Sequence, residues 1–156
     1  MKLHLEWARP MPLTEASVLD LIYAVDLKKL PNSPGIYILG RRWGSDFEAL
    51  YVGKANNIRS RVKRQLNNLR LMHHLKNAKS GKRVLLIGRF ITKRGQKWRT
   101  CIGLSERALI RYFISEGHDL VNKQGTRLKR HEVLSSGNHP KRHIPRLMYL
   151  EKARGE

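Results

Sequence analysis

The chain has 156 residues, which is long enough for one domain with a hydrophobic core and too short for two large ones. Its 32 Lys and Arg residues outnumber its 12 Asp and Glu residues, so the net charge is +20. This excess favours a polyanionic partner, above all nucleic acid. An acidic membrane surface is the weaker alternative because no apolar stretch is long enough to span a bilayer.

A helix and a β-hairpin are the first predicted elements. Apolar residues at helical spacing predict a helix over 14–28, with Thr14 as its N-cap. Two prolines in the segment 31–34 end this pattern and indicate a turn. Short apolar strands are expected over 35–40 and 49–53, and the polar segment between them predicts a hairpin.

Helical and extended segments alternate in the middle of the chain. A helix is predicted over 57–68, followed by a strand over 83–91. A fourth strand is expected over 98–102, before a second helix that runs from Ser105, its N-cap, to Glu116. The apolar stripe of the first of these helices is expected to contain Ile58, Val62, Leu66 and Leu69.

The order of the elements predicts an α+β fold, in which a small antiparallel sheet of three to four strands is flanked by helices. In the basic C-terminal part, edge strands are expected over 132–134 and 147–150. We expect three parts: an N-terminal helical extension over 1–30, a core over 31–122, and a basic extension over 123–156 that packs on the core.

The single cysteine and the N-terminus limit the chemistry and the location. Cys101 excludes an internal disulfide and a cysteine-based zinc site, and we interpret it as a small apolar residue in a strand. Residues 1–12 carry charges and lack the apolar region of a signal peptide, so we expect a cytoplasmic protein.

Glu106 is an isolated carboxylate, because no Asp or Glu lies between it and Glu48. At 100° per residue it falls on the apolar side of its helix, whereas Arg107 and Arg111 share the polar side. A carboxylate on the apolar side needs a partner, either a basic side chain or a metal ion. A single carboxylate suits one Mg²⁺ or Mn²⁺ ion whose shell is completed by phosphate oxygens and water.

Tyr37 and Tyr51 lie in adjacent predicted strands, where aromatic side chains ordinarily fill the core. Each tyrosine lies close to a glycine, and Lys54 follows Tyr51 by three positions. Neighbouring cations favour a phenolate, so one tyrosine is a candidate to accept a proton from an attacking water molecule. The residues alone leave the choice between Tyr37 and Tyr51 open. Lys54 would assist deprotonation or bind phosphate.

Two arginines flank the apolar stripe of the 57–68 helix. Arg61 and Arg59 lie on opposite edges of the stripe, and Arg64 points away from it. A guanidinium at the edge of the stripe can reach over the sheet and bind a phosphate through two hydrogen bonds. The spacing alone does not select Arg61 over Arg59.

Several motifs together resemble the core of the GIY-YIG nuclease family over residues 31–122. Gly35-Ile36-Tyr37 is followed by Tyr51-Val52-Gly53-Lys54-Ala55, in which Val52 replaces the isoleucine of the family name. An arginine stands ten residues after Tyr51, and a helical glutamate and a Val-Asn pair follow further along the chain.

The resemblance implies an antiparallel sheet flanked by helices and an active site with one divalent metal ion bound by glutamate. It selects Arg61 over Arg59, and Gly35 and Gly53 are carried over as structural residues. The catalytic residues that it implies are Tyr37, Tyr51, Lys54, Arg61, Glu106 and Asn122. Which tyrosine is the general base stays open, and we favour Tyr37.

The sequence therefore favours a metal-dependent DNA endonuclease, for which the resemblance implies products with a 5′-phosphate and a 3′-hydroxyl. RNA is the less favoured substrate, and the form of the DNA (duplex, single-stranded or branched) stays open. The alternative is a basic nucleic-acid-binding protein without catalysis on the same scaffold. The residues expected to contact the nucleic-acid backbone are Arg59, Lys63, Arg64, Arg127, Lys129 and Arg130.

Overall fold

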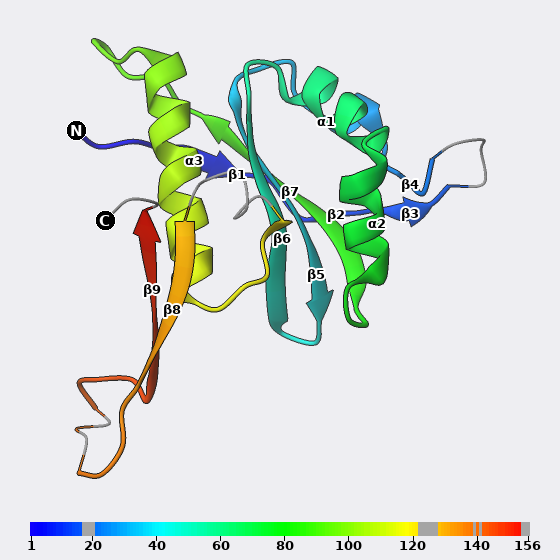
Figure 1. Ribbon diagram of the computed structural model, residues 1–156. Coiled ribbons are helices and arrows are strands. Elements are labelled where there is room, and N and C mark those ends of the chain that lie inside the picture. The colour runs from blue at the N-terminus through cyan, green and yellow to red at the C-terminus, as the bar shows by residue number, and fades with distance from the viewer. Residues whose placement is uncertain (17–20, 122–127, 139, 141, 154–156) are drawn as a thin grey trace.

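An antiparallel sheet lies at the centre of the molecule, with helices on both faces (Figure 1). The computed structural model describes residues 1–16, 21–121, 128–138, 140 and 142–153, without the side chains of 128–132 and 149–153. The strand order is β1 (Leu5–Trp7), β7 (Lys82–Phe90), β5 (Gly35–Trp43) and β6 (Asp46–Ala55), and β2 (Met11–Pro12) also pairs with β7. The α+β prediction is confirmed. The sheet has five strands, more than predicted, because two short N-terminal strands join it.

Strand β5 is buried on both faces because helices cover each of them. Successive side chains of a strand point to opposite faces. Tyr37 therefore packs in the cluster under α1 (Ile58–Leu66) and α2 (Leu69–Asn77), whereas Ile38 packs in a second cluster with α3 (Trp98–Ser115). Figure 1 shows α3 on one side of the sheet and the other two helices on the opposite side.

The predicted hairpin is formed by β5 and β6, and it sets the two tyrosines side by side. Tyr37 pairs with Gly53, and Leu39 pairs with Tyr51, so both phenol rings lie on the face covered by α1. The turn follows Trp43 at Gly44, whose φ of 57° lies in the left-handed region that favours glycine. The hairpin register thus fixes the relative positions of the two rings.

The predicted helix over 57–68 ends at Leu66, and a second helix that was not predicted begins at Leu69. The assignment of Leu69 to the first apolar stripe is wrong, because its side chain is exposed. Asn68 explains the break, since its Oδ1 accepts a hydrogen bond from the backbone N–H of Leu71 and caps the new helix. The other predicted stripe residues are buried, as expected: Ile58, Val62 and Leu66.

The helix predicted over 14–28, and with it the helical N-terminal extension, is wrong for the residues that the structure describes. These residues form β3 (Thr14–Glu15), β4 (Tyr23–Ala24) and the short 3₁₀ helix η1 (Leu27–Lys29). β-branched and aromatic side chains in this segment favour extended backbone, and packing on the core overrides the helical spacing.

The strand predicted over 98–102 is also wrong, because α3 begins at Trp98. Ser105 is not its N-cap: it is buried inside the helix, and its hydroxyl donates a hydrogen bond to the carbonyl oxygen of Cys101 over 2.9 Å. Cys101 is buried as expected, but in a helix. Neither α3 nor any other helix in the described residues is long and apolar enough to cross a membrane.

The C-terminal strands form a two-stranded sheet of their own. β8 (Leu128–Leu134) pairs with β9 (Leu147–Ala153) in antiparallel register. The two predicted edge strands are confirmed, and both are longer than expected. Strand β9 contacts α3 (Figure 1).

Candidate functional site

Two phenol rings lie next to each other under α1. The ring centroids of Tyr37 and Tyr51 are 5.8 Å apart. The ring of Tyr37 lies directly over Gly53, where a β-carbon would collide with the ring and its hydroxyl group. At Gly35, a β-carbon would collide with the carbonyl oxygen of Gly88 in the neighbouring strand. Glycine at these two positions therefore permits the close approach of a ring and of a strand.

Gln65 links the two hydroxyl groups. Its Nε2 donates hydrogen bonds to the hydroxyl of Tyr37 over 2.8 Å and to that of Tyr51 over 3.2 Å. Asn68 donates to Oε1 of Gln65 over 3.2 Å, which orients the amide. The sequence analysis missed Gln65. Its position one helical turn after Arg61, on the same face of α1, is the signal that would have found it.

The environment of Tyr37 disfavours its phenolate form. Tyr37 is 1% exposed. Burial raises the pKa of its hydroxyl far above the ordinary value of 10.0, and Tyr51 raises it further through electrostatic repulsion. The hydrogen bond from Gln65 and the charge of Arg61 lower this pKa, but they do not offset burial. The neighbouring cation thus acts on the pKa of Tyr37 in the expected direction, but burial outweighs it.

Glu106 connects α3 to the outer strand of the sheet. Its Oε1 accepts a hydrogen bond from the backbone N–H of Lys54 over 3.1 Å, and its Oε2 lies 3.6 Å from Nζ of the same residue. The Glu106 side chain is 20% exposed and that of Lys54 is 51% exposed. The carboxylate therefore has the basic partner that its helical position requires, and it still faces solvent.

Glu106 alone cannot fill the coordination shell of a divalent ion, so such an ion would need other ligands as well. Among the described residues, no group of three or more His, Cys, Asp or Glu side chains is arranged to hold a metal ion. A partly exposed carboxylate is nevertheless a ligand that Mg²⁺ accepts when phosphate oxygens and water complete the shell. The one-ion arrangement therefore stays a prediction.

Arg59 and Arg61 both lie in the first turns of α1, but their surroundings differ. Arg61 is half-buried and close enough to Tyr37 to lower its pKa. Arg59 donates hydrogen bonds to the carbonyl oxygens of Leu30 and Lys28, which attaches α1 to η1. The guanidinium of Arg59 therefore has a structural role, and the nucleic-acid contact predicted for it would have to replace these hydrogen bonds or use its remaining donors.

The remaining predicted residues divide into exposed and undescribed ones. Lys63 and Arg64 are exposed on the outer surface of α1. Asn122 and Arg127 lie outside the described residues, and so do the side chains of Lys129 and Arg130, although their backbone belongs to β8.

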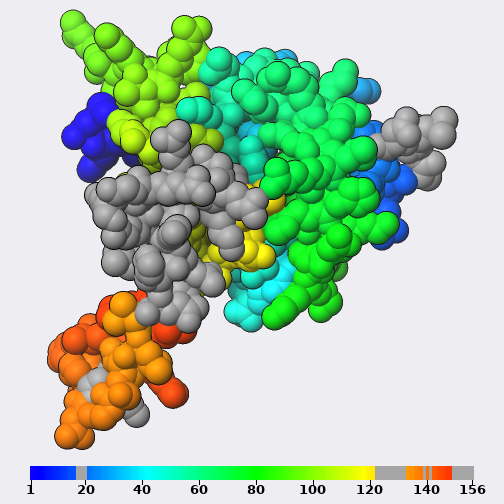
Figure 2. Space-filling view, viewed as in Figure 1, coloured from blue at the N-terminus to red at the C-terminus, as the bar shows by residue number. Residues whose placement is uncertain are grey.

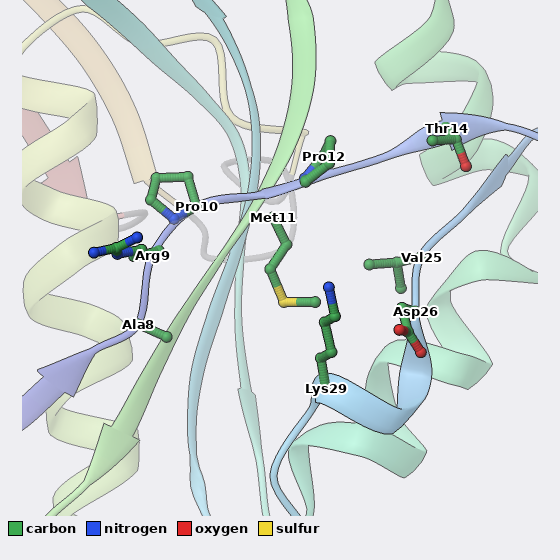
Figure 3. A pocket seen from close by; sticks show the side chains of 9 residues that line it. All are labelled: Ala8, Arg9, Pro10, Met11, Pro12, Thr14, Val25, Asp26 and Lys29. Carbon is green, nitrogen blue, oxygen red and sulfur yellow. The ribbon is translucent and has the colours of Figure 1, made fainter.

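A cavity of about 540 Å³ lies elsewhere, between the N-terminal strands and η1. Met11 and Lys29 both line it, and Figure 3 shows Val25 and Asp26 to their right. None of the predicted catalytic residues lines this cavity. The cavity is therefore separate from the tyrosine pair on β5 and β6 and from the contact between Glu106 and Lys54.

Comparison with known proteins gives short partial matches. No family model and no solved structure matches the chain. UvrABC system protein C from Chelativorans sp. is 43% identical over 58 residues, which is 37% of this chain and 8% of that protein. The protein of the same name from Brucella suis is 53% identical over 36 residues, 23% of this chain and 5% of the relative.

A third match has the same name and comes from Brucella abortus. It is 51% identical over 43 residues, which is 28% of this chain. The chain spans 8%, 5% and 6% of the lengths of these three relatives. The likeness is therefore to a small segment of each relative and not to the whole protein.

Proposed function

We propose that the protein is a metal-dependent DNA endonuclease of the GIY-YIG type, which hydrolyses phosphodiester bonds with one divalent ion. The observations that carry the proposal are the two hydrogen-bonded phenols on the β5–β6 hairpin and the contact of a partly exposed carboxylate, Glu106, with Lys54 of β6. These groups come from separate segments of the chain, and they match the order of the family motifs.

The relatives support DNA as the substrate. The partial matches are to UvrABC system protein C, which contains a GIY-YIG domain. The net charge of +20 supports a polyanion, because Lys and Arg side chains neutralise phosphates. We infer that DNA rather than RNA is cut, and that the product carries a 5′-phosphate and a 3′-hydroxyl.

The reaction begins with a water molecule whose oxygen forms a bond to phosphorus as the bond to the 3′ oxygen breaks. A general base must first lose its own proton, and burial opposes that loss at Tyr37. Tyr51 is half-buried and shares Gln65 with Tyr37. We therefore assign proton acceptance to Tyr51 and a supporting hydrogen bond to Tyr37.

Basic residues stabilise the charge that develops on the phosphoryl oxygens. Arg61 is placed beside the phenols, where a guanidinium can bind phosphate through two hydrogen bonds. Lys54 is half-exposed, so its ammonium can leave Glu106 and bind phosphate instead. Asn122 is proposed as a further contact to phosphate or to water on the metal ion.

Glu106 is the residue that would hold the metal ion. Its Oε1 accepts the backbone hydrogen bond of Lys54, so we propose Oε2, which lies 3.6 Å from the half-exposed ammonium of Lys54, as the oxygen that coordinates the ion. A divalent ion bound there would offset negative charge on the leaving oxygen and so lower the barrier to hydrolysis.

The proposal is tested by incubating supercoiled plasmid and single-stranded circular DNA with the protein, with Mg²⁺ or with EDTA. Nicked or linear products that require Mg²⁺ and carry 5′-phosphate ends are expected. Binding of DNA without cleavage under every metal condition would instead support a nucleic-acid-binding protein without catalysis.

A further inference from the structure

The C-terminal hairpin of β8 and β9 projects beyond the core (Figures 1 and 2). Each strand has seven residues, so the ribbon is roughly 23 Å long at about 3.3 Å per residue. One strand contacts α3, and the far end extends past the edge of the central sheet. A ribbon of this length can reach across the width of a nucleic-acid duplex.

The far end of the ribbon is apolar on both of its faces. Leu134 is paired with Leu147, and Val133 is paired with Met148. Neighbouring pairs point to opposite faces of a sheet, and all four side chains are exposed. A strand that packs on one core or on one flat partner has a single apolar face. Apolar residues on both faces instead suit insertion into a groove.

Basic residues flank these apolar residues in the sequence. Residues 128–153 contain six Lys or Arg residues and two Glu residues. Arg142 and Arg146 are exposed at the same end, near the exposed Ile144. A partner with negative charge on both sides of a slot is complementary to this arrangement, and the grooves of duplex DNA have that form.

We propose that the β8–β9 ribbon enters a groove of duplex DNA, an inference that rests on DNA being the substrate of the proposed nuclease. The two arginines contact the phosphates that border the groove. The apolar side chains contact the bases and act as a wedge that bends the duplex, as apolar side chains do in other groove-binding proteins. The ribbon thereby holds the DNA for cleavage.

The test measures the affinity of the full chain for a labelled duplex and for a single strand of the same sequence. All proteins carry Glu106→Gln to prevent cleavage. One variant adds Arg142→Ala and Arg146→Ala, and a second adds Leu134→Ser and Leu147→Ser. A control with the same loss of charge adds Lys93→Ala and Arg94→Ala, two exposed residues in the loop before α3.

The arginine variant is expected to lose duplex affinity and to reduce the slope of log K against log salt by about two. The leucine variant is expected to weaken duplex binding roughly tenfold without changing the slope of log K against log salt. It should also bend the duplex less, as measured by energy transfer between labels at the two DNA ends. Both should bind the single strand as the Glu106→Gln parent does. The control with Lys93→Ala and Arg94→Ala should bend the duplex as much as the Glu106→Gln parent does.

Equal losses in the control and in the arginine variant would overturn the inference, because general charge would then explain the binding. The inference would also be overturned if the leucine substitutions convert a dimer to a monomer and leave duplex affinity unchanged. The far end of the ribbon would then be a contact between copies of the chain. Ribbon-dependent duplex binding by a chain that never cleaves DNA would remove the proposed activity and leave this inference standing.

Discussion

Gln65 donates a hydrogen bond to the hydroxyl of Tyr37 over 2.8 Å, from a helix that packs across the strand carrying the tyrosine. The same amide nitrogen reaches Tyr51 over 3.2 Å. One side chain therefore fixes the separation of the two phenol oxygens and the direction in which each can share its proton. The site depends on α1 for this order as much as on the sheet.

Replacing Gln65 with methionine, which has a similar shape and no donor, should disturb the tyrosine pair without unfolding the protein. We expect single-turnover cleavage to slow by roughly 10- to 100-fold, because the phenols lose their common support. The pH profile should also change, since Gln65 lowers the pKa of Tyr37. Gln96→Met, at a half-buried glutamine outside the site, serves as the control and should leave the rate and the profile unaltered.

Removing each phenol hydroxyl separately should distinguish the two tyrosines. Tyr51→Phe is expected to reduce the cleavage rate by roughly 100-fold or more, the usual loss when a general base is removed. Tyr37→Phe should cost less, because the raised pKa of Tyr37 keeps its hydroxyl protonated. Single-turnover kinetics at matched stability are the measurement. A larger loss for Tyr37→Phe would reverse the assignment.

Gly53→Ala should damage the site through packing. The added methyl group collides with the ring of Tyr37, whose side chain is buried. We expect a loss of about 1–3 kcal/mol in the free energy of unfolding, together with a slower reaction. Gly103→Ala is the matched control: its methyl group would lie 3.6 Å from Nζ of Lys54, an ordinary contact. Urea denaturation that shows equal destabilisation by both substitutions would contradict this account.

His118 should make stability depend on pH. Its Nδ1 accepts a hydrogen bond from the backbone N–H of Ala49 over 2.8 Å, so the neutral ring is the bonded form. Burial lowers its pKa below the ordinary 6.5, although Glu48 and Glu116 act in the opposite direction. At a pH between the lowered pKa of the folded protein and the unfolded value of 6.5, only the unfolded chain binds a proton on this ring. The contribution of the neutral ring to stability is therefore complete above pH 6.5 and is lost as the pH falls below it.

His118→Asn tests this pH dependence, because an asparagine Oδ1 can accept the same hydrogen bond without titrating. Urea denaturation between about pH 5 and pH 8 should show a smaller acid-side loss of stability for the variant than for the wild type. Identical pH dependence in the two proteins would exclude His118 as the source.

The sequence was sufficient for the parts of the fold that local patterns determine. Two short apolar segments with a polar segment between them predicted the hairpin of β5 and β6, and the spacing in α1 predicted its buried face. The start of α3 was missed because Trp98 and Ile102 favour strands locally, whereas their helical spacing buries one side against the sheet. The break at Asn68 depends on a cap that only the structure reveals.

The sequence predicted most residues of the candidate site, but not Gln65 or the hydrogen bonds that link the side chains. Motif spacing indicated Tyr37, Tyr51 and Glu106, and the structure places the first two in contact. The link through Gln65 and the raised pKa of Tyr37 depend on burial and on helix packing, which the order of residues does not specify. The role of the backbone of Lys54 in orienting Glu106 is likewise a property of the folded chain.

Glu106→Gln tests the central claim most directly, because the amide can still accept the backbone hydrogen bond of Lys54 but is a poor metal ligand. Cleavage is measured across a Mg²⁺ titration beside Glu116→Gln, which removes an exposed carboxylate at the end of the same helix. We predict a loss of roughly 1,000-fold or more for Glu106→Gln at unchanged stability, and wild-type cleavage for Glu116→Gln. Wild-type cleavage by Glu106→Gln, with the same Mg²⁺ dependence, would contradict the account.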